Sequence, residues 1–149
     1  QMMSKIIRQV ENGPDYQAQL DVSRPKADAT VSDAISCAIR RISSILPVAV
    51  LVNYSESGSS SLRAARERPA VPILNLTPNL STARRLSVAW GVHSVVNDRL
   101  RQVDEVCSTA LEIAQAQGMA ERGDTLVITA GVPFGQPGST NSLRIETLI

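Results

Sequence analysis

The stretch VAVLVNYSESGSSSLRAARER, residues 48–68, decides the fold of this chain. Its first part, VAVLV at 48–52, is a short continuous apolar run, which is typical of a strand buried on both faces. Its last part, 62–68, predicts a short basic helix. The serine- and glycine-rich segment 55–61 between them therefore predicts a turn that leads from a buried strand into a helix.

This turn has the chemistry of an anion-binding site. The first backbone N–H groups of a helix point at one spot, and the positive end of the helix dipole lies there too. Serine hydroxyls add donors, and Gly58 lets the backbone approach a ligand closely. The segment contains neither a Walker loop nor a dinucleotide fingerprint. The pattern is compatible with a phosphorylated ligand, but the spacing alone is explained equally well by serines that simply cap the helix.

The rest of the chain alternates between short apolar runs and helical patterns. After 48–53, strands are expected at 71–76, 92–96, 125–129 and 143–148. Helices are expected at 2–10, 31–44, 62–68, 81–89 and 102–117, and the polar stretch that follows the first helix through residue 25 is expected to be loop or linker. This alternation predicts a mainly parallel α/β sheet with helices on both faces.

Ligands of such sheets bind beyond the carboxyl ends of the strands. The serine-rich segment follows the strand at 48–53, and the loop at 131–141, rich in glycine and proline, follows the strand at 125–129. Two loops that meet at one edge can hold one ligand from both sides. We therefore expect the binding site between these two loops.

Composition excludes several classes of function. The 149 residues suffice for one domain with a hydrophobic core, and only 3% of them are aromatic, so Val, Ile, Leu and Ala must fill that core. A net charge of +1 and few aromatic residues argue against nucleic-acid and anionic-membrane partners. No apolar run approaches the roughly 18 residues of a membrane helix. The cysteines Cys37 and Cys107 fall in separate helical patterns, which favours reduced thiols and a cytoplasmic protein.

Catalytic and metal sites are not expected. His93 is the only histidine and is predicted at the start of a strand, about 15 Å from Ser57 at the opposite rim of the sheet. A serine nucleophile needs its base within hydrogen-bond reach. No second metal ligand stands near His93 at ligand spacing.

Two segments near the C-terminus carry a family resemblance. GDTLVITAG at 123–131 and PGSTNSLRI at 137–145 resemble the C-terminal end of pyruvate kinases, which shows a G-D strand, a glycine-rich loop and G-[ST]-T-N-x-[LI]-[RK]-[IV]. Segment 55–69 is similar to the family's phosphate loop, and segment 72–92 to its next strand–helix unit. The resemblance covers about residue 29 to the C-terminus. It implies a three-layer α/β/α fold with a mainly parallel five-stranded sheet whose last strand is antiparallel.

The resemblance also implies a domain organisation and a function. Residues 1–28 resemble the last helix of the family's barrel domain with its linker, and 29–149 a regulatory domain; the start at Gln1 suggests a piece of a longer chain. The parent enzyme transfers phosphate from phosphoenolpyruvate to ADP, giving pyruvate and ATP, and needs magnesium and potassium in its barrel. This region is expected to hold no catalytic residue, cofactor or metal ligand. Its expected partners are the barrel of the same chain and further copies in a tetramer, joined through the edge strand at 143–148.

The implied effector site consists of small residues in both loops. These residues are Ser55, Glu56, Ser57, Gly58, Ser59, Ser60, Gly135, Gly138, Ser139 and Thr140. Glu56 stands where bisphosphate-responsive members often carry Lys, and 132–137 contains no Arg or Lys. A sugar monophosphate or AMP is therefore expected rather than fructose bisphosphate, with further positive charge available from Arg63, Arg66 or Arg84. Two alternatives stay open, a stand-alone phosphate-binding module and a purely structural oligomerisation domain.

Overall fold

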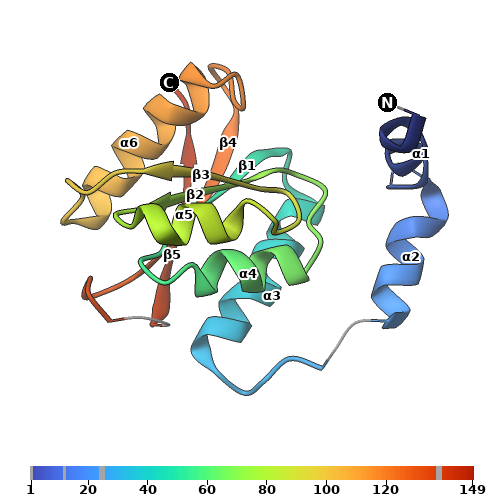
Figure 1. Ribbon diagram of the computed structural model, residues 1–149, viewed down its shortest axis with the longest axis horizontal. Coiled ribbons are helices and arrows are strands. Elements are labelled where there is room, and N and C mark those ends of the chain that lie inside the picture. Colours follow the sequence, from blue (N-terminus) through green and yellow to red (C-terminus); the bar gives the residue numbers. More distant parts are fainter. Residues whose placement is uncertain (1, 12, 24–25, 137–138) are drawn as a thin grey trace.

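The computed structural model describes residues 2–11, 13–23, 26–136 and 139–149 (Figure 1). The helices are α1 (Met2–Glu11), α2 (Pro14–Ser23), α3 (Val31–Ile45), α4 (Ser59–Arg66), α5 (Leu80–Leu86) and α6 (Val103–Ala116). The strands are β1 (Val48–Tyr54), β2 (Ile73–Thr77), β3 (Val92–Val96), β4 (Thr125–Gly131) and β5 (Thr140–Thr147).

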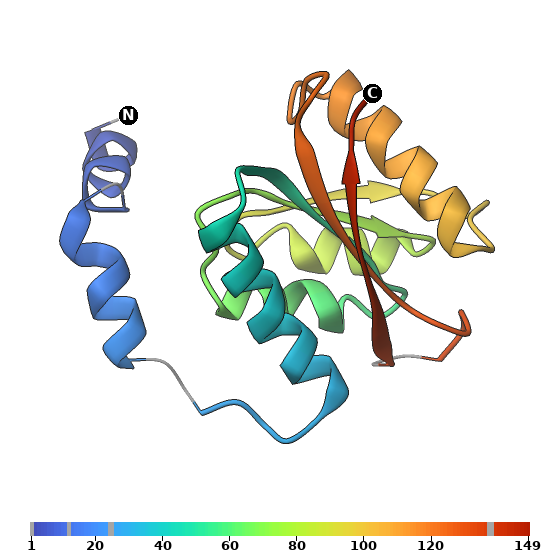
Figure 2. The same ribbon diagram turned by 180° about the vertical axis from the view of Figure 1, so that it is seen from behind.

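The strands form one sheet in the order β3-β2-β1-β4-β5. All neighbouring pairs are parallel except β4 and β5, which are antiparallel. The connections β1-α4-β2 and β2-α5-β3 run in one direction along the sheet, and β3-α6-β4 runs back. Because parallel crossovers are right-handed, α6 lies on the opposite face from α3 and α4 (Figure 2). The expected three-layer fold with an antiparallel last strand is confirmed.

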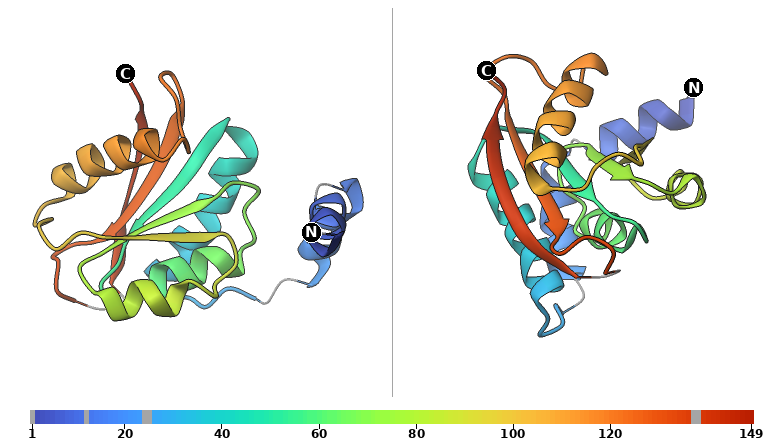
Figure 3. Two further views of the ribbon diagram at one scale, coloured as in Figure 1. Left: turned by 45° about the horizontal axis from the view of Figure 1, so that its top comes forward. Right: turned by 90° about the vertical axis from the view of Figure 1, so that its left-hand side faces the viewer.

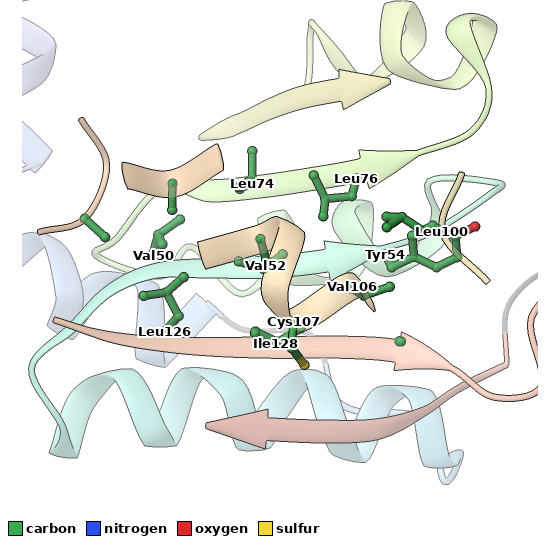
Figure 4. Packing of buried hydrophobic residues seen from close by; sticks show 14 of the residues in the cluster. Val50, Val52, Tyr54, Leu74, Leu76, Leu100, Val106, Cys107, Leu126 and Ile128 are labelled. Carbon is green, nitrogen blue, oxygen red and sulfur yellow. The ribbon is translucent and has the colours of Figure 1, made fainter. Parts of the chain in front are cut away.

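Strand periodicity produces two apolar layers. Toward α6, alternate residues of β1, β2 and β4 are buried: Val50, Val52, Leu74, Leu76, Leu126 and Ile128 (Figure 4). On the other face, Leu51, Ile73 and Val127 pack with Ile39 of α3 and Ala64 of α4. Small alanines on the helices let them approach the sheet closely, which explains how a core so poor in aromatic residues is filled.

The prediction of a loop before the α/β body is wrong. Residues 14–23 form α2, in a stretch where a polar composition indicated loop or linker. Its apolar residues do not gather on one face, so no helical periodicity was available to predict it. Asp15 lies in its first turn, where a carboxylate interacts favourably with the helix dipole.

The helix after the serine-rich segment begins earlier than predicted. α4 starts at Ser59 and not at Leu62, so the last three serines form its first turn. Gly58 is the N-cap residue and has a left-handed backbone, with φ 77° and ψ 2°. The serine-rich segment is therefore a loop of four residues, 55–58, joined to the first turn of a helix.

Helices α1 and α2 lie to one side of the α/β body (Figures 1 and 3). Trp90 Nε1 donates a hydrogen bond of 3.0 Å to Glu11 Oε1, and Arg40 lies 3.6 Å from Asp21. α1 exposes its apolar side chains to solvent: Met2, Met3, Ile6, Ile7 and Val10. In the described part of the chain, no helix has both the length and the apolar character needed to cross a bilayer.

A buried carboxylate joins the start of α3 to α4. Asp33 Oδ2 accepts hydrogen bonds from the backbone N–H of Asp28 at 2.9 Å and from Arg66 Nη2 at 3.0 Å. Arg63 Nε lies 3.4 Å from Asp33 Oδ1. The Asp28 N–H and then the Arg66 guanidinium hold the pKa of Asp33 below its ordinary value of 3.8.

We expect Asp33→Asn to lower stability at neutral pH and to flatten its dependence on acid. A carboxyl group with a lowered folded-state pKa contributes stability above its unfolded value, and this is lost as pH falls below 3.8 through the folded pKa. Urea midpoints measured from pH 7 to pH 2 test this. Midpoints of the variant and the parent protein should converge in acid, and a constant offset at every pH would contradict the assignment.

Candidate functional site

The two loops meet at one pocket beyond the carboxyl ends of β1 and β4. The pocket is lined by Tyr54, Ser55, Glu56, Ser60, Gly131, Phe134, Gly135, Gln136, Ser139 and Thr140. Six of the ten residues expected at the site line it: Ser55, Glu56, Ser60, Gly135, Ser139 and Thr140. Gly138 lies outside the described residues, and Ser57, Gly58 and Ser59 are adjacent to the lining in the chain.

Hydroxyl groups order the serine-rich loop from within. Ser55 Oγ accepts a hydrogen bond of 2.9 Å from the Gly58 N–H. Ser57 Oγ accepts one of 3.4 Å from the Ser59 N–H and lies 3.0 Å from Ser59 Oγ. The loop is therefore folded before any ligand arrives, with the N-terminal end of α4 at the wall that Ser60 lines.

The wall opposite is formed by the loop between β4 and β5. The side chain of Asn141 brackets the backbone of Val132, donating to its carbonyl at 2.6 Å and accepting from its N–H at 2.8 Å. Phe134 stacks on Tyr54 with ring centroids 4.6 Å apart. The space enclosed amounts to about 20 Å³, which is room for roughly one water molecule.

A direct contact joins the two walls of the pocket. Ser60 Oγ and Thr140 Oγ1 share a hydrogen bond. The Thr140 carbonyl also accepts one of 3.3 Å from Ser32 Oγ of α3. All three side chains belong to buried residues. The first turn of α4 is thereby connected to the start of the edge strand β5.

The charges around the pocket differ from the expected set. Arg63 and Arg66 bind Asp33 and do not line the pocket, and neither does Arg84. Arg85 of α5 instead donates a hydrogen bond to the Ser57 carbonyl. Sequence reasoning missed Arg85, because only the packing of α5 against the loop brings it there.

Hydrogen bonds from α5 and the loop before it explain this packing. The Glu56 carbonyl accepts from Thr82 Oγ1 at 2.8 Å and from Asn79 Nδ2 at 3.1 Å.

Burial raises the pKa of the Tyr54 hydroxyl, and the Glu56 carboxylate raises it further, whereas Arg101 lowers it. Tyr54 is therefore a neutral hydrogen-bonding group at physiological pH. The pocket is lined by hydroxyl groups beside the first turn of α4, which suit an anion, and by one carboxylate, that of Glu56, which opposes it.

Comparisons with known proteins point to one family. The family model "Pyruvate kinase, alpha/beta domain" matches residues 33–146. A pyruvate kinase of Methylorubrum extorquens is 42% identical over 143 residues, covering 96% of this chain and 30% of its own length. A pyruvate kinase of Geobacillus stearothermophilus is 32% identical over 146 residues, and the match covers 98% of this chain and 25% of that protein.

A solved structure agrees with the sequence relatives. A Cryptosporidium parvum pyruvate kinase in complex with ADP superposes with a TM-score of 0.78 at 26% identity. The match covers 89% of this chain and 26% of that one. The chain thus spans between a quarter and a third of the length of the relatives it matches.

Proposed function

The chain belongs to the pyruvate kinase family, whose C-terminal α/β domain it contains, and from this premise we propose that its pocket binds a phosphorylated effector. The observation that carries the proposal is the meeting of the two loops beside the first turn of α4. Backbone amides and the positive end of a helix dipole stabilise a phosphate there, and the hydroxyls of Ser55, Ser60 and Thr140 supply further hydrogen bonds.

The activity of the whole protein is part of this proposal. The parent enzyme transfers phosphate from phosphoenolpyruvate to ADP in the cytoplasm, with magnesium and potassium bound in its barrel domain. The effector favours one arrangement of the subunits and so changes the activity of a site elsewhere, by a coupling of about 1–3 kcal/mol. The exposed apolar face of α1 supports contact with the barrel of the same chain.

A titration of the chain with ribose 5-phosphate, followed through the backbone amide NMR signals of the protein, tests the position of the site. Ribose without a phosphate is the control. We expect the amide signals of residues 55–60 to shift with the phosphate compound and to stay in place with ribose. Shifts confined to another region would place phosphate binding elsewhere and contradict the proposed site.

Arg85 supports a monophosphate as the ligand. In the described part of the chain its guanidinium contacts the serine-rich loop, and the Glu56 carboxylate opposes a second dianion. We expect Arg85→Ala to weaken binding of ribose 5-phosphate about 5-fold, because an exposed ion pair contributes about 1 kcal/mol. Calorimetry measures this, with Arg84→Ala as the matched control. Equal losses in both variants would remove Arg85 from the site.

Subunit assembly through β5 is the second part of the proposal. In the described part of the chain β5 pairs only with β4 and forms one edge of the sheet, so backbone groups on its outer side beyond Thr140 are available to a second copy in an isologous contact. The Ile145 side chain is 46% exposed, and we expect Ile145→Asp to lower the constant for self-association by at least about tenfold. Sedimentation measures this. A parent protein that is monomeric at high concentration would contradict assembly through this edge.

A further inference from the structure

A row of polar side chains crosses the sheet beneath the first turn of α4. In one register, β3, β2, β1 and β4 contribute Ser94, Asn75, Asn53 and Thr129. Ser61 of α4 lies over the middle of the row. Asn53, Ser61, Asn75 and Thr129 are at most 1% exposed, in a layer whose neighbouring residues are apolar. Buried amides in such a layer demand hydrogen-bond partners.

These five side chains form one continuous chain of hydrogen bonds. Thr129 Oγ1 donates to Asn53 Oδ1, Asn53 Nδ2 to Ser61 Oγ at 3.4 Å, Ser61 Oγ to Asn75 Oδ1 at 2.8 Å, and Asn75 Nδ2 to Ser94 Oγ at 3.3 Å. Each amide accepts through its oxygen and donates through its nitrogen, so every bond runs in the same direction. Bonds arranged in this way polarise and strengthen one another.

Ser61 is the only member of this row that does not belong to the sheet. Its hydroxyl both accepts from Asn53 and donates to Asn75, so a shift of α4 would leave two buried amide groups without partners. An unpaired buried polar group is costly, and this cost opposes movement of the helix. Ser60, the preceding residue, lines the pocket, and Gly58 caps the same turn.

We propose that the polar row Thr129–Asn53–Ser61–Asn75–Ser94 is a positioning device that holds the first turn of α4 where a phosphate binds. The ligand part of this inference rests on the proposed function. Asn53, Ser61 and Asn75 are positioning residues, because they act on the ligand only through the helix turn.

The test uses an apolar replacement of the row in the full chain. The triple variant Asn53→Leu, Ser61→Ala and Asn75→Leu removes donors and acceptors together, which preserves the fold better than removing one partner alone. We expect the Leu62 N–H, which closes the first helical hydrogen bond onto Gly58 at 3.1 Å, to exchange about tenfold faster with solvent. Affinity for ribose 5-phosphate should fall about tenfold as well.

A buried serine outside the row is the control. Ser36→Ala removes a hydroxyl whose hydrogen bond lies within α3, to the Ser32 carbonyl at 2.9 Å, and should change neither quantity. Unchanged Leu62 exchange in a folded triple variant would overturn the proposal, as would faster exchange with unchanged affinity. If the parent protein binds no phosphate compound, the proposed function fails, and Leu62 exchange still decides whether the row holds the turn.

Discussion

Gly58→Ala is expected to lower the free energy of unfolding by about 3 kcal/mol. Two costs add at this residue. Its φ of +77° is a left-handed conformation that side chains with a Cβ adopt only with strain. A Cβ would also lie 3.0 Å from both Leu86 Cδ1 and Thr82 Cγ2, which belong to buried residues of α5. Urea unfolding measures the loss.

Gly118 provides a matched control for the strain alone. Its φ is +66°, and a Cβ built there would meet nothing within 4 Å. Gly118→Ala should therefore cost about 1 kcal/mol. The difference between the two variants isolates the close approach of α5 to the serine-rich loop. Equal losses would mean that α5 does not press on Gly58 and that the loop is less tightly held than the contacts indicate.

Ser57→Glu is expected to weaken phosphate binding about 100-fold, or about 2.7 kcal/mol, while leaving the fold intact. The new carboxylate lies one residue before the N-cap of α4, where it interacts favourably with the helix dipole. It therefore takes the place of the ligand's charge and repels a phosphate. The same charge stabilises the helix and offsets the loss of the Ser57 Oγ hydrogen bonds to Ser59, so the urea midpoint should stay at the unsubstituted value, which separates lost binding from unfolding.

Ser108→Glu is the control for added charge. Ser108 is exposed on α6, which covers the opposite face of the sheet, and the substitution makes the same change in net charge. Calorimetry with ribose 5-phosphate should give the parent affinity for Ser108→Glu. Undiminished binding by Ser57→Glu would show that the phosphate does not occupy the start of α4.

Most of the α/β body follows from local patterns in the sequence. The continuous apolar run at 48–52 and the apolar residues 126–128 indicated strands buried on both faces, and β1 and β4 are buried along most of their length. The antiparallel last strand came from the family resemblance. Helix α2 could not be predicted in this way, because its apolar residues do not gather on one face.

The meeting of the two loops was predictable from the sequence, but the contacts that support the pocket were not. Loops that follow parallel strands leave the sheet at the same end, beyond the carboxyl ends of the strands, and this is sufficient to bring Ser60 and Thr140 to one pocket. The position of Arg85 depends on how α5 packs against the loop. The polar row depends on register between strands, which brings Asn53 opposite Asn75. Register is a tertiary property that a single strand pattern does not determine.

The central claim is that the pocket binds a phosphorylated effector. Calorimetric titration of the unsubstituted chain with ribose 5-phosphate, glucose 6-phosphate, AMP and fructose 1,6-bisphosphate tests it most directly. We predict saturable binding of at least one monophosphate, tighter than that of the bisphosphate, because the Glu56 carboxylate lines the pocket and Arg85 bonds the Ser57 carbonyl beside it. Tightest binding of the bisphosphate would contradict the assigned ligand class. Binding of none of the four would contradict the effector site itself.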